Sequence, residues 1–274
     1  AFSLELLRSH AYITNLVTFR TALLREIGGY DVTLNASHNY DLILRAVERS
    51  STIVHIPEVL YTSVQLPRIA IQDKKRKDFD SVKKVIQNHL ARCSEIAEVS
   101  TNESFEYLDI RYPLQKGLRV AIIIPTKNHQ DLLRQCVESI ERTVQGIDYD
   151  IIVIDHESDQ EAAIVYFEEL RKHHQVLRYT GSFNFSAINN WAVRQLEGDY
   201  SHYLFCNNDI QAIEEGWLGR MLELGQKSDV GIVGATLFYP DGHTFQHAGV
   251  CVGMFGAAEH FAKYMNKYRP DGMV

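Results

Sequence analysis

The sequence predicts an α/β fold with a mostly parallel, mixed sheet and helices on both faces. From Arg119 onward, apolar runs of strand length alternate with segments of helical periodicity, which is typical of parallel strands joined by helices. Several of these runs end in hydroxyl, amide or carboxylate side chains, and open α/β sheets bind ligands at that edge. The chain has 274 residues, so one large or two smaller domains are expected, and a hydrophobic content of 45% is enough to bury a core.

The second half of the chain is expected to hold the alternating elements. Its first strand, Val120–Ile124, ends at Pro125, and Asp131 is expected to cap the helix that follows. The run Tyr203–Phe205 is wholly apolar and predicts a buried strand. The further expected strands are Ile151–Ile154, Val176–Tyr179 and Val230–Ala235, and the further expected helices are Glu161–His173, Ala187–Leu196 and Gly216–Gly225.

The first hundred residues predict a less regular arrangement. A basic run, Lys74–Lys77, begins an expected helix that reaches Ala91, and we interpret this run as a solvent-exposed face rather than an anion site. Residues 93–118 are polar with little periodicity and are interpreted as a linker. The predicted domains are therefore residues 1–70, a helix and linker at 71–117, and residues 118–274. The other expected elements are helices at Thr21–Ile27, which Gly28 and Gly29 end, and at Asn39–Arg49, and strands at Ile13–Phe19, Ile53–Ile56 and Val59–Tyr61 around Pro57.

Composition and charge exclude some classes of function. The net charge of -7 and the isoelectric point near 5.9 argue against nonspecific nucleic-acid binding, which needs a basic surface. No apolar run approaches the roughly 20 residues that span a bilayer. The chain begins at Ala1 within a segment expected to be structured, so we expect it to be a piece of a longer protein. A reducing cytoplasm is the expected location, because Cys93, Cys136, Cys206 and Cys251 are widely spaced without a metal-type pairing, and Cys136 and Cys206 lie in segments expected to be buried. A peripheral place at the inner face of the membrane is included in this expectation.

Polar residues at four expected strand ends should meet at one edge of the sheet. The oxygens of Asn207, Asn208 and Asp209 suit Mg²⁺ or Mn²⁺, ions that commonly sit between protein and phosphate. The simpler alternative is that the polar residues are turn formers and helix caps, as Asp155 and Asn184 could be. Because four such ends coincide, a site for a metal-bound diphosphate is the favoured interpretation. The four ends are Pro125-Thr126-Lys127-Asn128, Asp155, Gly181–Asn190 and Asn207-Asn208-Asp209.

Residues 118–260 resemble the nucleotide-binding half of the family-two glycosyltransferases, which have the GT-A fold. The resemblance implies Asp209 as a ligand of Mn²⁺ or Mg²⁺, with Asn207 in place of the family's first aspartate. It also implies that a UDP- or dTDP-sugar donor is bound by Pro125, Thr126, Asn128, Asp155, Asn184, Asn207 and Asn208. The motifs that carry it are the four strand ends, Phe183–Asn190, Tyr239-Pro240-Asp241-Gly242 and Gln246-His247-Ala248-Gly249.

Residues 10–66 resemble the acceptor-binding half of the same fold, although that half normally follows the nucleotide half. The similar segments are Phe19–Asp31, which ends in Gly-Gly-Tyr-Asp, and His38–Leu42. The family's catalytic base is an aspartate. Its place is taken here by Asn39, whose amide cannot accept a proton at neutral pH. Asp41 is the remaining candidate base, and the alternative is a carboxylate that only stabilises the first turn of a helix.

The resemblance implies inverting, hexosyl-type transfer to a glycan or lipid-linked glycan acceptor in bacterial cell-surface polysaccharide synthesis. The alternative is a noncatalytic nucleotide-sugar-binding or scaffold module, because the usual base is missing. A different doubly wound nucleotide-binding protein is disfavoured, since no Gly-x-Gly-x-x-Gly or phosphate loop follows Val120–Ile124. Loss of a general base costs about 10²–10⁴ in rate, so we expect slow transfer by this chain alone.

The inverted order of the two halves leads to one further expectation. A donor half alone would leave a sheet edge and apolar faces uncovered. The chain carries a matching half upstream, and closing a long connection costs little more than closing a short one. We therefore expect residues 10–66 to complete residues 118–260 as a circularly permuted GT-A unit, within one chain or by exchange in a dimer. The alternative is two separate, incomplete lobes.

Overall fold

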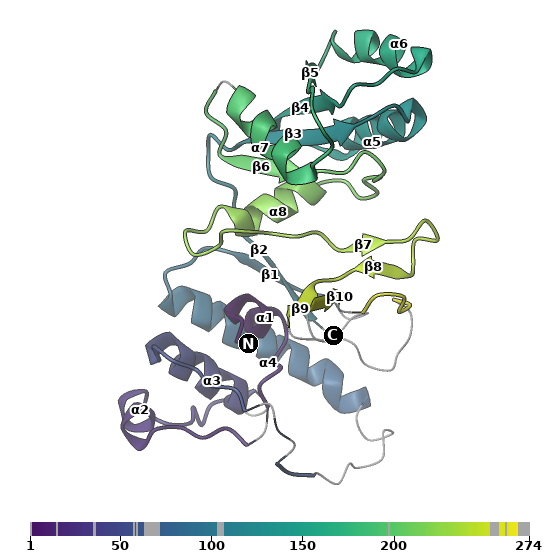
Figure 1. Ribbon diagram of the computed structural model, residues 1–274. Coiled ribbons are helices and arrows are strands. Elements are labelled where there is room, and N and C mark those ends of the chain that lie inside the picture. The colour runs from purple at the N-terminus through teal and green to yellow at the C-terminus, as the bar shows by residue number, and fades with distance from the viewer. Residues whose placement is uncertain are drawn as a thin grey trace. The chain divides into compact units, whose positions relative to one another are not determined.

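The computed structural model divides the chain into two compact units, Ala1–Pro113 and Leu114–Val274 (Figure 1). We call them the first unit and the second unit, and each has buried hydrophobic residues of its own. The described residues are 2–14, 16–34, 37–56, 58, 60–62, 72–102, 107–196, 198–252, 258–260 and 262–267.

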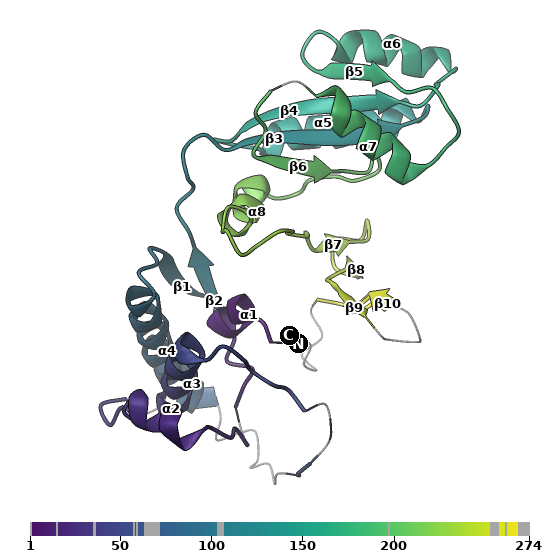
Figure 2. The same ribbon diagram turned by 60° about the vertical axis from the view of Figure 1, so that its left-hand side comes forward.

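The second unit is built on a four-stranded parallel sheet with the strand order β5-β4-β3-β6 (Figure 2). The central strands β3 and β4 consist largely of isoleucine and valine that are almost fully buried, as expected for parallel strands covered on both faces. The predicted α/β class is thereby confirmed. The strands are β3 (Arg119–Thr126), β4 (Asp148–Asp155), β5 (Gln175–Arg178) and β6 (His202–Phe205).

Helices cover both faces of this sheet because successive residues of a strand point to opposite sides. Ile122 and Ile124 pack in one core with residues of α5, α6 and α8. Ile123, between them, packs in the opposite core with Ile188 and Ala192 of α7. Figure 2 shows α7 in front of the sheet and α5 behind it. The helices are α5 (Gln130–Thr143), α6 (Glu161–Leu170), α7 (Phe185–Gln195) and α8 (Trp217–Gly225).

Three sequence-based expectations for the second unit are wrong. Tyr203 and Phe205 are 43% and 52% exposed, because β6 is the last strand of the sheet and α7 packs on β3 instead. Val230–Ala235 forms no strand, and Ile232 is almost fully exposed. Asp131 lies in the first turn of α5 but does not cap it; the capping position is His129, whose side chain makes no cap hydrogen bond.

The described residues after α8 include two short antiparallel pairs of strands. β7 (Leu237–Phe238) pairs with β8 (Phe245–His247), and β9 (Val250–Val252) pairs with β10 (Ala258–His260). The turn between β7 and β8 is held by Asp241, whose Oδ1 accepts from the N–H groups of His243 and Thr244 at 2.9 and 2.8 Å. The Tyr-Pro-Asp-Gly motif is therefore the turn of a hairpin in this structure.

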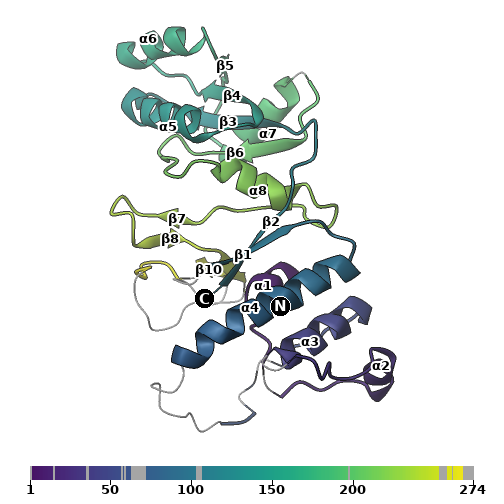
Figure 3. The same cartoon turned by 180° about the vertical axis from the view of Figure 1, so that it is seen from behind.

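The first unit contains four helices and an antiparallel pair of strands within its described residues. The pair was not expected, because residues 93–118 were interpreted as a linker. Val99, Leu108 and Ile110 are buried at alternate positions, and the strands pack against α1 and α4 (Figure 3). The elements are α1 (Leu4–Ser9), α2 (Thr21–Glu26), α3 (His38–Arg49), α4 (Gln72–Arg92), β1 (Glu98–Asn102) and β2 (Tyr107–Arg111).

The expected helices of the first unit are confirmed, whereas its expected strands are not. The described residues of 13–19, 53–56 and 60–61 form no strand. Pro57 and Val59 lie outside the described residues, as do the side chains of Lys74–Lys77. These apolar runs were mistaken for strands because a short apolar run does not by itself specify a pairing partner.

Candidate functional site

The ends of three neighbouring strands meet at one edge of the parallel sheet. Thr126, the last residue of β3, pairs in register with Asp155, the last residue of β4, and both are buried. The Thr126 hydroxyl accepts a hydrogen bond from Nδ2 of Asn208, which follows β6, at 2.9 Å. Pro125 is half-buried within β3. The structure thus brings Thr126, Asp155 and Asn208 to one edge, as the order of the strands predicts.

Ser158, which sequence reasoning missed, holds this edge together. Its backbone N–H donates to Oδ1 of Asp155 at 2.8 Å, and its hydroxyl accepts from the backbone N–H of Asn128 at 2.8 Å. Ser158 is itself buried. The described residues provide no hydrogen bond to the other oxygen of Asp155, so this oxygen is available to accept from a ligand.

Asn128 joins the loop after β3 to the loop after β4. Its backbone is left-handed, with φ at 57°, a conformation that Asn tolerates better than most residues. Its side-chain oxygen accepts from the N–H groups of Asp159 and Gln160 at 3.0 Å each, and its amide donates to Oδ1 of Asp159 at 3.0 Å. The amide is therefore used within the protein, and in this structure Asn128 positions the loop.

Asn184 caps α7, as the simpler alternative for this residue predicted. Its Oδ1 accepts from the N–H of Ala187 at 2.9 Å, and its backbone is extended, as is usual for a cap. Contact between Asn184 and a sugar nucleotide stays a prediction.

Asp209 lies in the segment that follows β6 and is exposed. The described residues include no ion-pair partner for its carboxylate. Asn207 is also exposed, and its backbone carbonyl accepts from the buried thiols of Cys206 and Cys136 at 3.3 and 3.6 Å. A hydrogen bond to α5 anchors the residues that follow Asp209, because the N–H of Ala212 donates to the Ser139 hydroxyl at 2.9 Å. An open carboxylate beside amide oxygens on an anchored segment fits a hard divalent cation.

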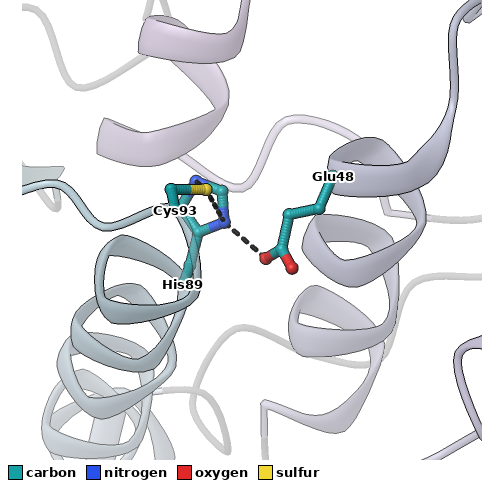
Figure 4. Close-up of side chains that lie close together, drawn as sticks. All are labelled: Glu48, His89 and Cys93. Atoms are coloured by element: carbon teal, nitrogen blue, oxygen red, sulfur yellow. Dashed lines mark hydrogen bonds and ion pairs between the residues drawn. The ribbon is translucent and has the colours of Figure 1, made fainter.

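A second cluster of ligand-type side chains lies in the first unit and consists of Glu48, His89 and Cys93 (Figure 4). Arg8 Nε donates to His89 Nε2 at 3.1 Å, so this ring nitrogen is the acceptor and the ring proton lies on Nδ1. Nδ1 then donates to Glu48 at 2.6 Å. Both ring nitrogens are thus engaged. A cation would also meet the positive charges of Arg8 and Arg92, so this cluster is a structural network rather than a metal or nucleophile site.

The network predicts how stability depends on pH. Burial, the largest cause, lowers the pKa of His89; the hydrogen bond to Glu48 opposes this, and the charge of Arg8 adds to it. In the unfolded chain the imidazole of His89 takes up a proton near pH 6.5. In the folded protein the ring therefore stays neutral until the pH is lower. The stabilising contribution is fully present above about pH 6.5 and is lost as the pH falls toward the folded pKa.

We expect the denaturant concentration at the unfolding midpoint of the first unit to decrease when the pH is lowered from about 7.5 to about 5.5. Both tryptophans, Trp191 and Trp217, lie in the second unit, so their fluorescence follows that unit and circular dichroism follows both. His89→Gln removes the titrating ring and should reduce the pH-dependent fall. An equal fall in the wild type and the variant would show that other groups cause it.

The residues matched to an acceptor site lie around two hollows of the first unit. A hollow of about 310 Å³ is bordered by Gly28, Gly29 and Asp41. Asp41 is only 3% exposed; its Oδ2 accepts from Arg45 Nε at 2.8 Å, and Arg92 lies 3.7 Å from Oδ1. A hydroxyl group would have to displace a guanidinium to reach this carboxylate. Asn39 lines the other hollow, of about 260 Å³.

The profile of the family described as glycosyl transferase family 2 matches residues 121–267, more than half of the chain. The chain belongs to this family. The match includes the three strand ends that meet at the sheet edge, together with Asn184 and Asp209. It leaves out the first unit.

Two relatives align with nearly the whole of this family-2 chain. One is the uncharacterized protein y4gI of Sinorhizobium fredii, which is 36% identical over 266 residues, 93% of this chain and 29% of the relative. The other is the O-antigen biosynthesis protein RfbC of Myxococcus xanthus, which is 34% identical over 264 residues, 94% of this chain and 20% of the relative. The chain thus spans less than a third of the length of either relative.

Solved structures show more distant likeness. The mannosyltransferase PcManGT from Pyrobaculum calidifontis, in complex with GDP-Man and Mn²⁺, has a TM-score of 0.35 and 15% identity, covering 59% of this chain and 45% of that one. TarS of S. aureus in complex with UDP-GlcNAc has a TM-score of 0.32 and 18% identity, covering 40% and 31%. Among the described residues, no helix is long and apolar enough to cross a membrane.

Proposed function

We propose that the second unit binds a nucleoside diphosphate sugar together with a divalent cation. The observation that carries this proposal is the meeting of Thr126, Asp155 and Asn208 at the carboxyl edge of the sheet in a family-2 glycosyltransferase chain. This edge presents a buried carboxylate, that of Asp155, and an exposed carboxylate, that of Asp209. These groups match the N–H groups, hydroxyl groups and metal-bound phosphates of a sugar nucleotide.

Each residue of the candidate site has a defined part in donor binding. Asp155, fixed by Ser158, accepts from a ribose hydroxyl or a base N–H, which favours UDP- or dTDP-sugars. Thr126 and Asn208 keep the neighbouring strand ends together. Asp209 and Asn207 would hold Mn²⁺ or Mg²⁺. When bound, such an ion neutralises charge that develops on the leaving diphosphate.

We also propose that the parent protein transfers hexosyl groups with inversion to a glycan or lipid-linked glycan of the cell surface. The name of the Myxococcus relative, an O-antigen biosynthesis protein, supports this acceptor class. The acceptor side of this chain fits catalysis poorly, because Asn39 stands at the base position and Arg45 engages Asp41. A noncatalytic sugar-nucleotide-binding module is therefore the second candidate function. For either function, we propose that residues 10–66 complete residues 118–260 as a circularly permuted GT-A unit, within one chain or by exchange in a dimer.

Isothermal titration calorimetry with UDP and dTDP, with and without Mn²⁺, tests donor binding. We expect binding that depends on the metal, with EDTA abolishing it and excess Mn²⁺ restoring it. Equal affinity without metal would exclude the cation from the proposal, and absence of binding by both nucleotides would exclude the proposed function. Acceptor-dependent release of nucleotide then separates the transferase from the noncatalytic module.

A further inference from the structure

The loop that joins β5 to α7 is tied to the end of β4 by His156. Nε2 of this histidine lies 2.8 Å from the carbonyl oxygen of Gly181. A carbonyl can only accept, so Nε2 carries the proton and donates it. The backbone N–H of His156 donates to the carbonyl of Thr126 at 2.8 Å, which places the histidine beside the end of β3 as well. His156 is buried, and it directly follows Asp155.

Aromatic contacts fix the two ends of this loop. Tyr179 packs edge-on against Trp191 of α7, with ring centroids 5.4 Å apart, and its N–H donates to the carbonyl of Asp155 at 2.9 Å. The His156 ring lies 5.8 Å from Tyr179 and 5.8 Å from Phe183, measured between centroids. Asn184, the next residue, caps α7. The backbone on both sides of Phe183 is therefore held by hydrogen bonds.

Phe183 remains 74% exposed although His156 contacts it. A single exposed apolar side chain is ordinary on a protein surface. The position of Phe183 is distinctive, because its ring packs against His156, the residue that follows Asp155. The loop that carries Phe183 leaves the end of β5 beside Asp155, so the open side of the ring belongs to the same carboxyl edge of the sheet as this carboxylate.

We propose that Phe183 is the stacking surface for the planar base of the nucleoside diphosphate and that His156 is its positioning residue. This inference rests on the proposed function, since it concerns the same donor. A base offers N–H groups at its edge and a π-face, and Asp155 and Phe183 provide one partner for each. His156 acts through Phe183 and through Gly181, to which it donates.

Phe183→Ala tests the stacking surface, and Phe185→Ala is the matched control. Phe185 is the first residue of α7 and is 49% exposed, so it resembles Phe183 in size, exposure and neighbourhood. We expect Phe183→Ala to weaken the binding of UDP with Mn²⁺ about 30-fold, the middle of the range for loss of base–aromatic stacking. Phe183→Tyr should bind like the wild type, and so should the Phe185→Ala control.

Two variants of His156 test the positioning role. His156→Phe keeps a ring but loses the N–H donor, whereas His156→Gln keeps a donor of similar reach. We expect the Phe variant to weaken UDP binding as Phe183→Ala does and to speed hydrogen exchange of the amides of residues 181–187. The Gln variant should recover much of both. Similar behaviour of the two variants would exclude the hydrogen bond to Gly181 as the cause.

The outcomes separate this inference from the proposed function. If the wild type binds neither UDP nor dTDP, the proposed function fails and the inference fails with it. If the wild type binds and Phe183→Ala binds equally well, the proposed function stands and the inference is overturned. Because Phe183 is exposed, its alanine variant should keep the wild-type unfolding midpoint, so a folding defect will not obscure the result.

Discussion

Replacement of Arg8 by methionine is expected to destabilise the first unit by about 3 kcal/mol, toward the lower end of the range for breaking a buried ion pair. The Arg8 side chain is 1% exposed, and its guanidinium donates to His89, Tyr112, Glu5 and Glu95. Methionine keeps most of the volume but removes every one of these donors. The lower end of the range applies because Glu5 and Glu95 are about one-third exposed, at 31% and 30%, so water partly replaces the lost partner.

Denaturant unfolding measures this effect. The circular dichroism transition of the first unit should move to lower denaturant, while the fluorescence of Trp191 and Trp217 in the second unit should change little. Arg171→Met is the control, because Arg171 is 42% exposed and forms an ion pair with Glu168, a local partner three positions earlier. An exposed pair of this kind contributes about 0–1 kcal/mol. An Arg8 variant as stable as this control would refute a structural role for the network.

Replacement of Asp209 by alanine is expected to remove the metal-dependent part of nucleotide binding. Loss of groups that merely support a metal ligand costs about 10–100-fold in affinity, and loss of the ligand itself should cost at least as much. Stability should not change, because Asp209 is exposed and forms no ion pair among the described residues. Asp209→Asn removes the charge of the side chain but keeps its shape, and we expect this variant to bind the nucleotide as poorly as the alanine variant.

The comparison of metal-free and metal-containing titrations decides the role of Asp209. The variant with Mn²⁺ should bind UDP no better than the wild type without Mn²⁺. Asp229→Ala, a change at another exposed aspartate of the second unit, should leave binding unchanged. A variant at Asp209 that still responds fully to Mn²⁺ would place the cation elsewhere.

Residues of the candidate site differ in how far the sequence predicted them. Thr126, Asp155 and Asn208 were predictable because each follows an apolar strand, and parallel strands end at one edge. His156 and Ser158 were missed. Their only sequence signal is that they follow Asp155, and their roles depend on Gly181 and Asn128, which are 25 and 30 positions away. The capping role of Asn184 was foreseen as an alternative, since capping is a local interaction.

The sequence by itself determined the helices α2 to α8, the positions of the strands β3 to β6 and the family, because local periodicity and motif spacing are properties of neighbouring residues. Only the tertiary structure decided that β6 is half-exposed, that residues 98–111 include a pair of strands rather than a linker, and that Arg8 is buried. Burial and partner choice depend on contacts over long sequence distances, such as the 81 positions between Arg8 and His89. Such contacts form only when the chain has folded, and no local pattern records them.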